Sequence, residues 1–197
     1  MGTPESVSQD CHEEHKKTQK LINLLVCFFV IFAAIQYRAL MNEPKPWSLT
    51  DLHHLGITVK DIESAIEFYR DKLGMELIGR RPSVTADYVA EQTGYENVEL
   101  NVASFRVSPT SRQTLEVVQY MTHQGEPTNQ ATNRAGNSHL CLLVDDLQAC
   151  YNELSSRGVQ FKSPPVTITA GPNKSGLVVY FYDPDGYTLE LFQPATV

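Results

Sequence analysis

The sequence predicts an α+β fold in which two βαβββ modules form a cupped mixed sheet, preceded by an N-terminal hydrophobic helix. A segment that begins at His54 recurs in outline at His139, at an offset of 85 residues. Each copy has the pattern of a strand followed by a helix, and each module closes with a strand that contains Thr-Leu-Glu. A continuous apolar run, residues 21–35, lies before both copies. These patterns indicate one folded domain, residues 51–197, behind an apolar segment.

The first fifty residues divide into three parts. A polar tail, residues 1–20, precedes a hydrophobic segment, residues 21–40, and a linker, residues 41–50, whose prolines stop any helix. The apolar run is shorter than the roughly 20 residues of a usual bilayer span, but it lengthens if the residues after it enter the interface. Lysines upstream of the run favour a cytoplasmic N-terminus. We predict a single-pass membrane anchor, and the alternative is a cleaved signal peptide of a secreted protein.

The first module, residues 51–122, opens with a strand in which apolar residues alternate with polar or small ones. Ile57 and Val59 face one side of this strand, and His54 faces the other. Because an amphipathic helix follows at once, the apolar side should pack under that helix. The histidine should therefore point to the opposite face of the sheet.

Matching residues bound the helix of each module. In the first module, Asp61 is a plausible N-cap, and Gly74 stands where a left-handed stop belongs. The second module, residues 137–194, has Asp146 and Gly158 at the same places. The repeat therefore extends from the strand through the whole helix.

A glutamate stands in the middle of the last strand of each module. These strands, TLEVVQY and YTLELFQP, place Glu116 and Glu190 on matching faces. Together with His54 and His139 on the first strands, they bring two imidazoles and two carboxylates to the concave face of the cupped sheet. This donor set suits one divalent metal ion, such as Ni, Co, Zn, Fe or Mn. Two positions of an octahedron remain for a small-molecule substrate that offers two adjacent oxygens.

This arrangement predicts an enzyme. A metal that holds two neighbouring oxygens acts as a Lewis acid, and it stabilises the charge that develops when a proton leaves the adjacent carbon. A ligating or nearby glutamate takes that proton, so Glu116 and Glu190 are the candidate catalytic residues. The site forms either within one chain or between the two copies of a homodimer. The formal charge of −7, with no cluster of Lys and Arg in the body of the chain, indicates no nucleic-acid partner.

These residues resemble the vicinal oxygen chelate superfamily, which contains glyoxalase I, methylmalonyl-CoA epimerase, extradiol dioxygenases and the fosfomycin and bleomycin resistance proteins. The resemblance lies in AIEFYRDKLGMEL after the first strand and in the closing YDPDGYTLELFQP, and it covers about residues 51–194. It implies paired βαβββ modules with a divalent metal at His54, Glu116, His139 and Glu190.

The ligand set is similar to that of bacterial glyoxalase I, which implies that Glu190 is the general base and Glu116 its counterpart across the substrate carbon. Extradiol dioxygenases have no carboxylate at the place of Glu116, and epimerases of this superfamily usually carry glutamine there. The resemblance thus implies a metal-dependent lyase or isomerase like lactoylglutathione lyase. The alternatives are an extradiol-type dioxygenase or acyl-CoA epimerase on the same fold, or a ligand-sequestering protein like those of bleomycin resistance.

Four positions bear on the substrate. Relatives that bind glutathione have an arginine on the first strand, where this chain has Thr58, and an asparagine four residues past the first-module glutamate, where it has Tyr120. Lys162 and Arg134 lie near other places where the family holds glutathione carboxylates. We therefore expect this chain to share the metal chemistry of the family more fully than its use of glutathione as a substrate.

Overall fold

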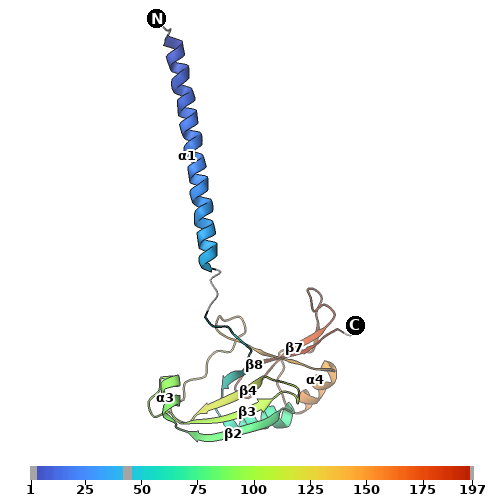
Figure 1. Ribbon diagram of the computed structural model, residues 1–197. Helices are drawn as coiled ribbons and strands as arrows, with labels where there is room; N and C mark the ends of the chain where they lie inside the picture. Colours follow the sequence, from blue (N-terminus) through green and yellow to red (C-terminus); the bar gives the residue numbers. More distant parts are fainter. Residues whose placement is uncertain (1–3, 42–45, 196–197) are drawn as a thin grey trace. The chain divides into compact units, whose positions relative to one another are not determined.

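The computed structural model describes residues 4–41 and 46–195, with side chains from residue 18 to 37 in the first of these segments. The chain divides into two compact units, Met1–Asp51 and Leu52–Val197. Within these described residues, the first unit contains one helix and the second contains the strands (Figure 1).

Helix α1 (Pro4–Met41) is 38 residues long. It begins well before the apolar run, so the predicted polar tail is helical from Pro4 onward; its Glu, Gln and Lys residues are good helix formers. The stretch Thr18–Tyr37 has 20 residues with a mean hydropathy of 2.0, and none of it is buried. The predicted linker, residues 41–50, lies partly outside the described residues.

The second unit opens with a module of the predicted order, strand, helix and three strands, with one further helix, α3, that was not predicted. Its sheet has the order β1-β4-β3-β2, in which β1 runs parallel to β4 and the other neighbours are antiparallel. The elements are β1 (His54–Thr58), α2 (Ile62–Ile66), the π-helix η1 (Glu67–Lys72), β2 (Glu76–Val84), α3 (Asp87–Thr93), β3 (Leu100–Arg106) and β4 (Thr114–Tyr120).

The second module repeats this order. Its sheet runs β5-β8-β7-β6, with β5 parallel to β8 and the other neighbours antiparallel. The described residues therefore form two four-stranded mixed sheets, and the predicted α+β class with paired βαβββ modules is confirmed. The elements are β5 (Leu140–Leu143), α4 (Leu147–Ser156), β6 (Val166–Thr167), β7 (Leu177–Tyr182) and β8 (Thr188–Gln193).

The helix boundaries follow from matching residues, as predicted. The side chains of Asp61 and Asp146 each accept a backbone N–H of the first helical turn at 2.9 Å. Gly74 and Gly158 follow the helices with φ of +73° and +80°, a left-handed conformation that glycine adopts without a Cβ clash.

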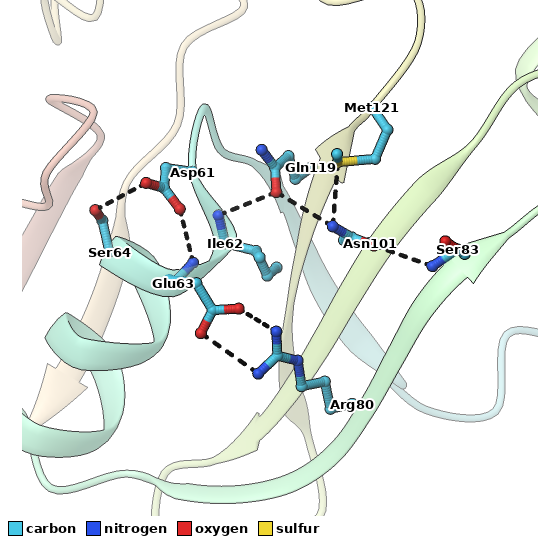
Figure 2. Close-up of polar contacts among 9 residues, drawn as sticks. All are labelled: Asp61, Ile62, Glu63, Ser64, Arg80, Ser83, Asn101, Gln119 and Met121. Atoms are coloured by element: carbon cyan, nitrogen blue, oxygen red, sulfur yellow. Dashed lines mark hydrogen bonds and ion pairs between the residues drawn. The ribbon is translucent and has the colours of Figure 1, made fainter.

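A glutamine three residues after each glutamate ties the helix to its sheet. Gln119 Oε1 accepts the N–H of Ile62 at 3.3 Å, and Gln193 Oε1 accepts the N–H of Leu147 at 2.8 Å. Ile62 and Leu147 begin α2 and α4, where the backbone N–H has no partner inside the helix. Figure 2 shows Gln119 between Ile62 and Asn101. Because side chains alternate along a strand, this glutamine points to the helix side and leaves the glutamate on the other face.

A π-helical turn widens the first helix and places two adjacent aromatic residues in the core. The N–H of Leu73 donates to the carbonyl of Phe68, five residues back, at 3.0 Å. Phe68 and Tyr69 are both buried. In a regular α-helix, consecutive residues point in directions about 100° apart, so burying both in one core is less favoured there than in the wider π-helical turn. Both side chains belong to one hydrophobic core that contains residues of both modules. Among its most deeply buried members are Tyr69, Phe105, Leu115, Leu147, Phe181 and Leu189.

Candidate functional site

The predicted donors lie on the face of each sheet that is turned away from its helix. In β1, Ile57 is buried, whereas His54 and Thr58 are exposed, as the alternation predicted. The register sets Gly56 opposite Glu116 on the neighbouring strand β4. His54 and Glu116 therefore belong to the same face of the first sheet, on adjacent parallel strands.

The second module brings its two predicted donors together. His139 Nε2 lies 2.9 Å from Glu190 Oε2, with the histidine side chain 40% exposed and the glutamate side chain 16% exposed. Tyr180, opposite Glu190 in the β7–β8 ladder, packs edge-on against the His139 ring with 5.2 Å between centroids. Burial raises the pKa of the Tyr180 hydroxyl, and the nearby Glu190 carboxylate adds to the rise. A nitrogen donor and an oxygen donor thus stand side by side at the edge of this face.

Cys141 is a member of this cluster that the sequence patterns did not single out. It lies opposite Glu190 in the β5–β8 ladder, at the position where the first module has Gly56. Burial raises the pKa of the Cys141 thiol to about 11, and the Glu190 carboxylate adds to this because it would repel a thiolate. The thiol therefore stays protonated at neutral pH and donates to Glu190. The mismatch of Gly56 with Cys141 in the repeat is the signal that marks this position.

The first module engages its two donors with other partners. Glu116 Oε2 accepts a hydrogen bond from Arg81 Nη2 on β2 at 2.8 Å. The Nδ1 atom of His54 lies 2.8 Å from Nδ1 of His53, so one imidazole donates to the other. Arg81 was not found from the sequence because its contact with Glu116 crosses a whole strand and follows no local spacing.

The four predicted ligands are of residue types that bind divalent cations, but their side chains do not all come together at one point. Among the described residues, no group of three or more His, Cys, Asp and Glu side chains is placed to hold a metal ion. His139 and Glu190 supply half of the predicted donors. Thr188 Oγ1, two residues before Glu190, is buried without a hydrogen-bond partner in the described part of the chain. Such an atom is ordinarily satisfied by water or a bound group, so the second module is the half that fits a ligand best.

Thr58 and Tyr120 mark the first-module side of the predicted substrate site. Thr58 is exposed on β1, opposite Val118 of β4. Tyr120 ends β4 and lies edge-on to Tyr95, with 6.0 Å between ring centroids. Glu116, Val118 and Tyr120 alternate onto one face, so the tyrosine lies about 13 Å along the strand from the glutamate at about 3.3 Å per residue.

The second-module side contains a pocket of about 630 Å³, lined by Gln130, Ala131, Thr132, Asn133, Lys162 and Tyr182. Lys162 Nζ lies 5.9 Å from the centre of the Tyr180 ring, and the same ring contacts His139. Arg134 directly follows the lining segment but does not line the pocket. An ammonium group with amide and hydroxyl donors around it suits an anionic group of a ligand.

The second unit is similar in sequence to one family of known proteins. A sequence model of the Glyoxalase/Bleomycin resistance protein/Dioxygenase superfamily matches residues 51–191. A 2-epi-5-epi-valiolone epimerase of Actinomyces sp. is 29% identical over 143 residues, which cover 71% of this chain and 77% of the relative. A lactoylglutathione lyase of Haemophilus influenzae is 27% identical over 142 residues, which cover 71% and 90%.

The fold is also shared with a solved structure. A glyoxalase family protein from Bacillus cereus superposes with a TM-score of 0.67 at 18% sequence identity, covering 78% of this chain and all of the other. At this identity the likeness concerns the fold alone.

Proposed function

Because the chain belongs to the glyoxalase/bleomycin resistance protein/dioxygenase superfamily, we propose that it is a divalent-metal-dependent lyase or isomerase of the glyoxalase I type. Such an enzyme removes a proton from the carbon next to a carbonyl group. The observation that carries the proposal is the pairing of His139 with Glu190 on an exposed face, at the positions that the repeat matches to His54 and Glu116. Relatives that are named as a lyase and as an epimerase support an enzyme.

The four repeat-matched residues His54, Glu116, His139 and Glu190 would hold the metal ion. When bound there, the ion supplies a Lewis acid that polarises a carbonyl and stabilises negative charge on neighbouring oxygens. To take part, His54 exchanges its contact with His53 for the site, whereas Glu116 keeps one oxygen on Arg81 and offers the other.

Glu190 is the better placed of the two glutamates to act as the base. Its neighbours are an imidazole and a protonated thiol, neither of which is a permanent cation. Glu116 is paired with the guanidinium of Arg81. A general base has to accept the substrate proton, and a carboxylate that is not paired with a guanidinium accepts a proton more readily.

The substrate class follows from the residues around the donors. The carbonyl and an adjacent oxygen would lie at the metal position, with an anionic extension that reaches Lys162 in its pocket. Thr58 cannot form the paired, charge-assisted bonds with which an arginine holds a carboxylate. We therefore expect weak turnover of the glutathione hemithioacetal of methylglyoxal and better turnover of other carbonyl substrates.

The test combines metal analysis with turnover, using the full-length chain purified in detergent. We expect a bound divalent ion, and turnover within a panel of hemithioacetals and acyl-CoA esters that stops on chelation and returns when the metal is restored. Oxygen consumption would instead indicate a dioxygenase. A metal-free chain that binds a member of the panel without converting it would indicate a ligand-sequestering protein.

We also propose that α1 anchors the protein in a membrane. At about 1.5 Å per residue, the stretch Thr18–Tyr37 is about 30 Å long, which equals the hydrocarbon thickness of a bilayer. Its large apolar side chains are exposed, Phe29 to 76%, and they would be costly to leave in water. A helix also satisfies its own backbone groups, as a membrane span must. A signal sequence that is removed is the alternative, and the mass of the mature protein distinguishes the two.

A further inference from the structure

Two consecutive arginines on β2 point to opposite faces of the first sheet. Arg80 pairs with Glu63 of α2 on the helix side, as Figure 2 shows, and Arg81 pairs with Glu116 on the other side. The register accounts for the difference, because Arg80 stands opposite Ala103, which is fully buried beneath the helix. The chain thus contains two neighbouring ion pairs of the same chemistry, of which only one involves a predicted metal ligand.

The Arg81 side chain reaches Glu116 across the intervening strand β3. Since neighbouring strands lie about 4.8 Å apart, β2 and β4 are separated by about 9.6 Å. Ser104 stands opposite Glu116 on β3, and Gly79 stands opposite Ser104 on β2. Arg81 itself stands opposite Val102, so its side chain crosses β3 diagonally toward the register position of Ser104 and Glu116. A glutamine at position 81 is too short to make the contact.

The contact occupies one oxygen of Glu116 and leaves the other available. Arg81 Nη2 donates to Oε2, and no hydrogen bond to Oε1 occurs among the described residues. The arginine side chain is 52% exposed, and an ion pair this accessible to solvent contributes little to folding. Carboxylates that bind metal ions are commonly oriented by a hydrogen bond from an outer residue, and loss of that residue weakens metal binding.

We propose that Arg81 is a positioning residue of the metal site: it holds Oε2 of Glu116 so that Oε1 is presented to the cation. This inference rests on the proposed function. Arg81 therefore distinguishes the two glutamates of the repeat: Glu116 is paired with a guanidinium, whereas Glu190 has an imidazole and a thiol as neighbours.

The test compares Arg81→Gln with Arg80→Gln, a matched control on the opposite face, in the full-length chain in detergent. Each protein is titrated with Co²⁺ while its visible absorption is recorded. We expect Arg81→Gln to bind Co²⁺ about 10–100-fold more weakly than the wild type, with an altered spectrum because the carboxylate changes its orientation. Arg80→Gln should keep both the wild-type Kd and the wild-type spectrum. Arg81→Lys, which keeps the charge but not the planar fork, should fall between the two.

A double-mutant cycle separates positioning from a general effect on the protein. If Arg81 acts through Glu116, Arg81→Gln adds no further loss of Co²⁺ affinity in a Glu116→Gln background. Additive losses, or an Arg81→Gln variant with the wild-type Kd and spectrum, would overturn the positioning role and leave the metal site standing. A wild-type chain that binds no Co²⁺ would overturn the proposed function itself, and this inference with it. Should Arg81→Gln not fold, Arg81→Lys serves in the same cycle, with wild-type binding as the contradicting result.

Discussion

Asp183 is a buried carboxylate at the joint between the two modules. Its Oδ2 accepts the hydroxyl of Tyr69 at 3.0 Å, and its Oδ1 accepts the N–H groups of Asp185 and Tyr187 at 3.0 and 2.7 Å. Burial raises the pKa of Asp183, although these hydrogen bonds oppose the rise. Burial, with the nearby Asp183 charge, also raises the pKa of Tyr69, so the hydroxyl keeps its proton and remains the donor. One side chain thereby links η1 of the first module to the β7–β8 turn of the second.

Replacing Asp183 with asparagine should change how stability depends on pH. A carboxyl group whose pKa is raised in the folded state stabilises the fold below its unfolded pKa of about 3.9, and this contribution is lost as pH rises through the folded pKa. Asparagine keeps one of the two acceptor oxygens and carries no charge, and the lost acceptor affects stability equally at every pH. In urea unfolding, the stability of Asp183→Asn relative to the wild type should therefore increase from pH 4 to pH 7. If the difference in free energy of unfolding between Asp183→Asn and the wild type stays constant or decreases from pH 4 to pH 7, the pKa of Asp183 is not raised by burial.

At the scale of elements, the features that local sequence predicted are those with local causes. The helices of both modules begin at Asp61 and Asp146 and stop before Gly74 and Gly158, because capping and left-handed conformation depend on single residues. Helix α3 was missed because it has little apolar periodicity of its own. It is held by a separate small cluster of Val89 with residues of β3, against which Val118 and Tyr120 of the more distant strand β4 pack.

Helix α1 should be necessary for membrane association. We expect the full-length chain to float with vesicles of zwitterionic and anionic lipid in a density gradient, and a chain that lacks residues 1–51 to remain in the soluble fraction. Phe28→Lys, near the centre of the apolar stretch, should oppose insertion by about 2.5–3.5 kcal/mol, whereas Phe28→Leu should not. If the shortened chain aggregates, the helix belongs to the core of the protein. If the shortened chain floats with the vesicles, the second unit has a membrane-binding surface of its own.

At the scale of the whole molecule, the repeat predicted the face on which each donor lies and also that all four donors meet, whereas among the described residues only His139 and Glu190 are in contact. Alternation along a strand is enough to place His139 and Glu190 on one face, and the structure brings them together. Whether Glu116 joins them depends on the packing of one module against the other and on Arg81, which reaches over β3. Such contacts connect residues distant in sequence through side-chain length and register, which no pattern within one strand reveals.

The central claim is that Glu190 removes a proton from a carbon next to a carbonyl, and exchange of that proton with solvent tests it most directly. In D₂O, the wild-type chain should incorporate deuterium at this carbon of the member of the hemithioacetal and acyl-CoA panel that it turns over best. Glu190→Gln should still bind Co²⁺, with exchange about 10²–10⁴-fold slower because the base is lost. Exchange at the wild-type rate in Glu190→Gln, or a metal-loaded wild type that catalyses no exchange with any member of the panel, would contradict the account.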